Sequence, residues 1–149
     1  MPVETLFFAA NFLALTGWAV LALAPLRRGV FIAAARWVAA ILGGAYFAIL
    51  LYLVGGGGNG LELTMTAAGL AALFSRPEVL LLGWIHYLAF DLWIGAWIAQ
   101  DARERRIPHG IVLPCLILTY FAGPVGLLIF LIVRFSRPRD HDRRAQPAS

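Results

Sequence analysis

A histidine and an aspartate lie in the middle of one long apolar segment. His86 and Asp91 belong to a run of about 21 residues, 79–99, and a helix needs about 20 residues to cross a bilayer. An ionisable group near the middle of a bilayer costs roughly 2.5–3.5 kcal/mol, so such groups often mark a functional site. We therefore predict an intramembrane functional site here, and hydrogen bonds that only support packing are the alternative.

The helical period limits what these two residues can reach. About 140° separates His86 from Asp91 on a regular helix, so the two should not bond each other and each needs partners from other segments. Tyr87 precedes Asp91 by four residues, which is within hydrogen-bonding range on a helix. Aromatic residues of this segment predict a pocket for a lipid-like ligand, with an interfacial aromatic belt as the alternative. These residues are Trp84, Phe90, Trp93 and Trp97.

A second histidine, His109, stands at the mouth of the next apolar segment. Pro108 precedes it and should hold it close to the membrane edge. Two histidines and a carboxylate can bind zinc or ferrous iron, so a metal centre of His86, Asp91 and His109 is one alternative. No tight motif such as H-E-x-x-H supports it, and we expect no metal. A proton relay is another alternative, because histidines and acidic residues in membrane helices often serve one.

The composition sets the class of protein. Hydrophobic residues make up 61% of the 149 residues and the mean hydropathy is +0.80, far above a soluble domain. Continuous apolar runs, rather than alternation of period two, argue against a closed barrel. The single cysteine, Cys115, excludes an internal disulfide. The net charge of +4 comes from arginines at segment ends, a position that favours lipid headgroups, and we expect no nucleic-acid partner.

The apolar segments predict an all-α polytopic membrane bundle with four transmembrane helices. The four segments cover residues 3–23, 30–54, 79–99 and 111–135. Residues 61–75 are short for a crossing and begin with polar side chains, so we predict a short interfacial or re-entrant helix there. Pro77 suits the first turn of the helix that follows. Pro114 and the Gly-Pro-Val-Gly run predict a kink near Gly123.

Several spacings predict local contacts. Asn11 and Thr16 lie inside the first segment and should hydrogen-bond to a neighbouring helix or to the backbone. Asp101 and Arg105 are four residues apart and should pair on one helix face. The first segment resembles a signal peptide, but no basic residue precedes its long apolar stretch, so we expect a membrane helix.

We expect one integral membrane domain, 1–135, followed by a disordered, arginine-rich tail at 136–149. Gly43 and Gly44 should let another helix approach closely, which is compatible with a homodimer. With four crossings, six arginines fall on each side of the membrane, so the positive-inside rule gives no orientation.

Four motifs together resemble one known family. They are GWIHYLAFDL at 83–92, IPH at 107–109, LPCL at 113–116 and GPVGLL at 123–128. In combination they resemble the family of the plant plastid protein called abscisic acid deficient four, and the resemblance extends from the first helix to Arg134. It implies an integral membrane protein that acts on a carotenoid or similar isoprenoid, because the plant member is associated with converting violaxanthin to neoxanthin.

That resemblance implies a reaction without redox change. Opening a 5,6-epoxide to an allenic alcohol requires one proton given to the epoxide oxygen and one removed from the polyene carbon, so no cofactor is expected. We predict His86 and Asp91 as the acid–base pair from their placement, with Tyr87 and His109 as secondary catalytic candidates.

The expected partners are membrane lipids and a hydrophobic isoprenoid-like ligand. The chain shows no long extension of the transit-peptide type, and its lysine-free composition suggests a bacterial inner membrane. A non-catalytic binding or assembly protein for a lipid-pathway complex is the alternative function. A small transporter ranks behind both, because the sequence contains no internal repeat.

Overall fold

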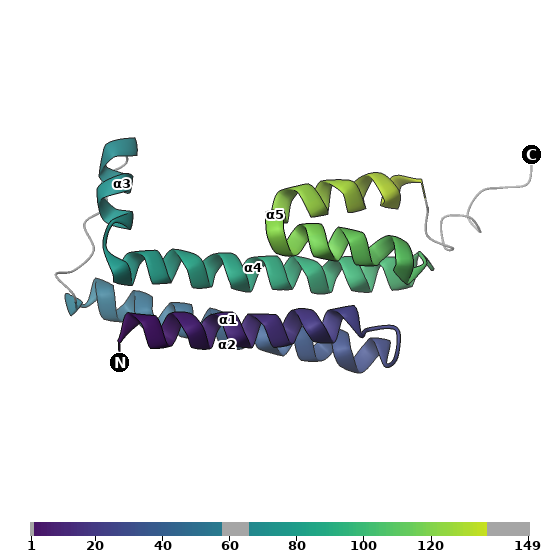
Figure 1. The fold of residues 1–149 in the computed structure, drawn as a ribbon, viewed down its shortest axis with the longest axis horizontal. Helices are drawn as coiled ribbons and strands as arrows, with labels where there is room; N and C mark the ends of the chain where they lie inside the picture. Colours follow the sequence, from purple (N-terminus) through teal and green to yellow (C-terminus); the bar gives the residue numbers. More distant parts are fainter. Residues whose placement is uncertain (1, 58–65, 137–149) are drawn as a thin grey trace, which may run out of the picture. The chain divides into compact units, whose positions relative to one another are not determined.

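The computed structural model describes residues 2–57 and 66–136, and this part of the chain forms five helices (Figure 1). They are α1 (Val3–Ala22), α2 (Arg28–Val54), α3 (Ala67–Phe74), α4 (Pro77–Glu104) and α5 (His109–Phe135). Four of them, α1, α2, α4 and α5, are long and apolar enough to cross a membrane. The prediction of an all-α protein with four long apolar helices and one short helix is confirmed.

Local sequence signals explain several helix ends. Helix α4 begins at Pro77, as predicted, because the first turn of a helix does not need the missing N–H of proline. Helix α3 begins after Thr66, whose hydroxyl accepts a hydrogen bond from the backbone N–H of Gly69 at 3.0 Å. Its eight residues extend about 12 Å, so it does not cross a bilayer. The predicted polar start of this segment, residues 61–65, lies outside the described residues.

The chain divides into two compact units, and each takes parts of α1, α2 and α4. The first unit consists of Met1–Thr16 and Trp37–Phe90 and therefore contains α3; the second consists of Gly17–Arg36 and Asp91–Ser149 and contains α5. Buried residues in the first unit include Leu53, Val79 and Leu82. Buried residues in the second include Leu21, Leu92, Ile98, Thr119 and Phe130.

Large apolar side chains are also exposed in both units. Phe12 and Trp37 in the first unit are each 72% exposed, and Phe121 and Phe135 in the second are 74% and 80% exposed. Such exposure is expected of a membrane protein, because lipid tails are as apolar as these side chains. The helices are thus apolar on their outer faces as well as on their packed faces.

Helix α5 turns back on itself (Figure 1). Its backbone leaves the helical conformation at Ala122, where φ is −149° and ψ is 62°. A Cβ atom added at Gly126 would collide with the backbone N and the hydroxyl of Thr119. On a continuous helix these two residues would lie about 10 Å apart along the axis, so the chain must reverse between them. The predicted kink near Gly123 is confirmed, and it is a reversal of direction.

The motif at the reversal suits such a turn. Pro124 follows Gly123 directly and falls in the first turn of the second half of α5, where its missing N–H is tolerated. Gly126 has no side chain, so the second half can lie against Cys115 and Thr119 of the first half. The Thr119 hydroxyl donates a hydrogen bond to the carbonyl oxygen of Cys115 at 2.7 Å, which satisfies a buried polar group.

Within the described residues, no other helix closely approaches Gly43 or Gly44 of α2, so the predicted close approach of another helix stays a prediction. A Cβ atom added at either glycine would meet no heavy atom within 4 Å. The buried side of α2 instead includes Ala39, Leu42 and Leu53. A pair of small residues permits close packing, but it does not determine which face of a helix is packed. The homodimer stays a prediction.

Candidate functional site

His86 lies among aromatic rings in the first unit. Its ring stacks on Phe90 with centroids 4.5 Å apart, and the ring of Tyr46 from α2 lies 5.5 Å away. The Phe90 contact follows from the four-residue spacing on α4, whereas Tyr46 supplies the expected partner from another segment. His86 and Phe90 are both exposed, so an apolar ligand lying against this face can reach the imidazole.

Trp84 and Tyr87 form a second aromatic group in the same unit. Their ring centroids lie 5.5 Å apart, and Phe7 of α1 stacks on Trp84 at 5.6 Å. Trp84 donates a hydrogen bond from Nε1 to Oδ1 of Asn11 at 3.2 Å, and Asn11 donates from Nδ2 to the carbonyl oxygen of Phe7 at 2.7 Å. The bonds predicted for Asn11, to a neighbouring helix and to the backbone, are confirmed. The side-chain amide of Asn11 thus holds Trp84 in place through the N–H of the indole ring.

Asp91 lies in the second unit at the middle of α4, against the reversal of α5. A Cβ atom at Gly123 would collide with the Asp91 carboxylate, so only glycine leaves room for the carboxylate there. The side chain is half-buried and its Oδ2 atom is buried. The second half of α5 begins at this point, and the N-terminal end of a helix favours a negative charge. This arrangement places a carboxylate where α4 meets the turn of α5.

Two other aromatic candidates, which lie in the second unit, each make a cation–π contact with an arginine. The guanidinium of Arg36 lies over Trp93, 5.9 Å from the ring centroid, and that of Arg134 lies over Trp97 at 5.6 Å. Contacts of this kind are worth about 0.5–2 kcal/mol and more when water is excluded. Phe130 packs edge-on against Trp97 at 5.7 Å. The sequence indicated Arg36 only as an arginine inside an apolar segment, and its contact with Trp93 was not predicted.

His109 lies at the edge of α5, beside a small pocket in the second unit. Its Nε2 atom is 3.1 Å from the carbonyl oxygen of Ala22. The pocket walls are largely apolar, with Ala24, Ile32 and Val112 among them, and Arg103 and His109 add basic groups. Neither His86 nor Asp91 lines this pocket.

Within residues 2–57 and 66–136, no group of three or more histidine, cysteine or acidic side chains could hold a metal ion. This finding gives no support to the alternative of a centre made by His86, Asp91 and His109. The described chain therefore presents acid–base groups and aromatic rings, and these are the groups from which a function must be argued.

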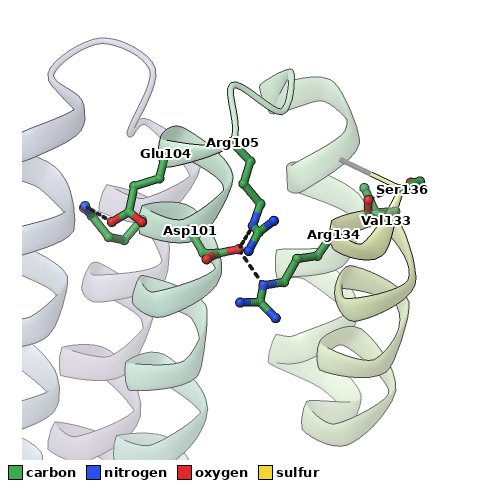
Figure 2. Close-up of polar contacts among 7 residues, drawn as sticks. Asp101, Glu104, Arg105, Val133, Arg134 and Ser136 are labelled. Atoms are coloured by element: carbon green, nitrogen blue, oxygen red, sulfur yellow. Dashed lines mark hydrogen bonds and ion pairs between the residues drawn. The ribbon is translucent and has the colours of Figure 1, made fainter. Parts of the chain in front are cut away.

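A buried ion-pair network closes the arginine-rich end of the second unit (Figure 2). Asp101 is only 2% exposed, and its Oδ2 atom accepts hydrogen bonds from Nε of Arg105 at 2.8 Å and from Nε of Arg134 at 2.9 Å. The predicted pair of Asp101 and Arg105 is confirmed. Arg134 was missed because 33 residues separate it from Asp101. The network ties the end of α5 to the end of α4.

Comparison with known proteins identifies a family. The model of the ABA DEFICIENT 4-like family, abbreviated ABA4-like, matches residues 5–130, which include all the candidate residues above. No curated protein and no solved structure shows significant similarity to the chain.

Proposed function

We propose that this integral membrane protein is an isomerase that acts on a carotenoid or similar isoprenoid lipid. The proposal starts from the family, because the chain belongs to the ABA DEFICIENT 4-like family. The observation that carries the proposal is a carboxylate, Asp91, at the middle of an apolar helix and against a break in α5. An ionisable residue at such a depth is expensive, and function is the usual reason for it. The membrane is proposed to be a bacterial inner membrane.

The exposed aromatic rings of α4 suit a long, rigid, apolar ligand. Phe90 is 61% exposed and Trp93 is 51% exposed, so a ligand can reach both side chains beside the His86 and Arg36 groups that cover one face of each ring. A polyene gains dispersion contacts with such rings that a flexible acyl chain matches less well. These contacts support a ligand of the carotenoid or isoprenoid class.

In the proposed reaction, an epoxide opens to an allenic alcohol without redox change. Asp91 takes the proton from the polyene carbon, the C–O bond breaks towards oxygen, and an acid returns a proton to that oxygen. Arg36 over Trp93 supplies a fixed positive charge in the same unit, which stabilises negative charge on the departing oxygen. His86 stays the candidate acid predicted from the sequence, and within the first unit its exposed ring next to Tyr46 and Phe90 supports access to a ligand.

The alternative is a non-catalytic binding or assembly protein. Its support is the contact of Asp91 with the reversal at Gly123, since a carboxylate at a helix N-terminus also stabilises a fold. Under this alternative the ligand binds but is not converted.

The test combines ligand analysis with conversion of an epoxy-carotenoid. Protein purified in mild detergent is compared with Asp91→Asn and His86→Ala, and Glu104→Gln serves as a matched acid-to-amide control because Glu104 is exposed at the end of α4. We expect wild type and control to retain an isoprenoid and to form a product of unchanged mass. Asp91→Asn should keep the ligand and lose about 10²–10⁴-fold in rate. Folded Asp91→Asn protein with full conversion would overturn the assignment, and bound but unconverted ligand in wild type would favour the alternative.

A further inference from the structure

The arginines of this chain are divided very unevenly between the two units. Eleven of the twelve belong to the second unit, together with five acidic residues. The first unit contains only Arg76, together with three acidic residues. The positive charge of the protein is therefore a property of the second unit.

The path of α5 brings Arg134 to the end of α4, next to Arg103, Arg105 and Arg106. Its halves, 109–121 and 123–135, each extend about 20 Å, which is short of the roughly 30 Å of a bilayer core. His109 at its start contacts Ala22 at the end of α1, and Arg134 near its end contacts Asp101 near the end of α4. Both ends of α5 thus lie beside the ends of α1 and α4.

We infer that α5 enters and leaves the membrane on one side, and that the arginines at this end form a basic face that binds the headgroups of anionic phospholipids. The basic face consists of Arg27, Arg103, Arg105, Arg106 and Arg134. This inference does not depend on the proposed chemistry.

The reversal changes the count of charges on the two sides of the membrane. If α1, α2 and α4 cross and α5 does not, Arg76 lies alone on one side, since a single crossing by α4 separates it from Arg103. The described arginines of the basic face then lie on the opposite side or at that membrane edge. The even division expected from four crossings disappears, and the positive-inside rule assigns the basic face to the cytoplasm.

The contacts of the basic face favour a lipid over a soluble anion. Arg103 reaches the start of α2, where its Nη1 atom would lie 3.6 Å from a Cβ atom at Gly29, and it also lines the pocket beside His109. Apolar side chains next to these arginines are strongly exposed, including Leu26 at 73% and Val30 at 62%. A ligand with a phosphate and acyl chains satisfies both kinds of surface, and a free phosphate satisfies only one.

Asp101 keeps part of this charge fixed in place. It holds Arg105 and Arg134 through a single carboxylate oxygen, so one negative charge faces two positive ones (Figure 2). Arg27, Arg103 and Arg106 are exposed. The five arginines of the face outnumber the two carboxylates at this end of α4, Asp101 and Glu104, so the formal net charge here is +3, which is the condition for attracting an anionic leaflet.

The first test determines the sides of the membrane. In a Cys115→Ala background, cysteines are introduced at Ser75 and Ser136, two exposed serines whose hydroxyls bond the carbonyl three residues earlier, and at Gly110, where a side chain meets open space. A membrane-impermeant maleimide is applied to intact cells and to inverted vesicles. We expect Ser75→Cys to react from outside, and Ser136→Cys and Gly110→Cys to react only in inverted vesicles. Reaction of Ser136→Cys on the same side as Ser75→Cys would show that α5 crosses and would overturn the inference.

The second test measures lipid preference by native mass spectrometry. Purified protein is mixed with phosphatidylglycerol or phosphatidylcholine, with and without excess inorganic phosphate. We expect at least a fivefold preference for phosphatidylglycerol, a severalfold loss of it in Arg27→Gln/Arg103→Gln, and little change in the control Arg76→Gln. Equal binding of both lipids, an equal loss in the control, or complete displacement by inorganic phosphate would each overturn lipid binding by the basic face.

Discussion

The two aspartates of α4 differ in what surrounds them. Asp101, at the membrane edge, is almost fully buried and bonds two guanidinium groups through one oxygen (Figure 2). Asp91, at the middle of the helix, lies against the backbone of Gly123 and keeps part of its side chain accessible. Fixed cations hold the Asp101 carboxylate in its charged state, whereas Asp91 lies where α5 reverses its direction. The comparison indicates an anchoring role for Asp101 and is compatible with the acid–base role proposed for Asp91.

The largest effect should come from Asp101→Asn. The amide leaves two arginines without their shared anion, and breaking a buried pair costs about 3–5 kcal/mol. Arg134 is 27% exposed and can regain water, so we expect the lower end, about 3 kcal/mol, seen as a marked fall in Tm in detergent. Asp91→Asn should lower Tm much less, and the exposed Glu104→Gln should leave it nearly unchanged. An equal fall in Tm for Asp101→Asn and Asp91→Asn would show that the two aspartates contribute equally to stability, against the expected difference.

The contacts of Asp101 also show what the sequence could and could not predict. The pair with Arg105 was predictable because both residues lie four apart on one helix. Arg134 was not, because the reversal of α5 brings it to Asp101 and no local spacing encodes that reversal. The Gly-Pro-Val-Gly run indicated a break, but the direction of the chain after it depends on Gly126 packing against Thr119.

In the candidate site, too, local spacing predicts contacts along one helix but not contacts between distant segments. The stacking of His86 on Phe90 follows from the period of α4, and the fold class follows from the length of the apolar segments. The Tyr46 ring and the contact of Asp91 with Gly123 come from distant parts of the chain. Sequence reasoning therefore named the candidate residues, whose function stays a prediction, and predicted only part of their surroundings.

The second-largest effect should come from Gly123, which lies against the Asp91 carboxylate. Gly123→Ala places a Cβ atom against the Asp91 carboxylate, so the turn or the side chain must shift, at a cost of about 1–3 kcal/mol. If the collision is the cause, the same change in an Asp91→Ala background should cost clearly less. Unfolding of the four proteins in the double-mutant cycle measures this coupling. Additive losses would mean that Gly123 is needed for the backbone turn alone.

The smallest effect is a gain at the membrane edge. Arg106 follows α4 with φ of 54°, a left-handed conformation that costs a residue with a side chain roughly 1–2 kcal/mol. The N–H of Ile107 donates to the carbonyl oxygen of Ala102 at 2.8 Å, and the N–H of Arg106 donates to the carbonyl oxygen of Arg103 at 3.1 Å. This pair of hydrogen bonds at a helix end usually has glycine at the position that Arg106 occupies. Arg106→Gly should therefore stabilise the protein by about 0.5–1 kcal/mol, despite the greater freedom of glycine in the unfolded chain. Arg106→Ala removes the same charge but keeps the strain, so it should not raise Tm. If Arg106→Ala raises Tm as much as Arg106→Gly does, the gain comes from removing a positive charge at the arginine-rich end of the second unit. Backbone strain at position 106 would then not be its cause.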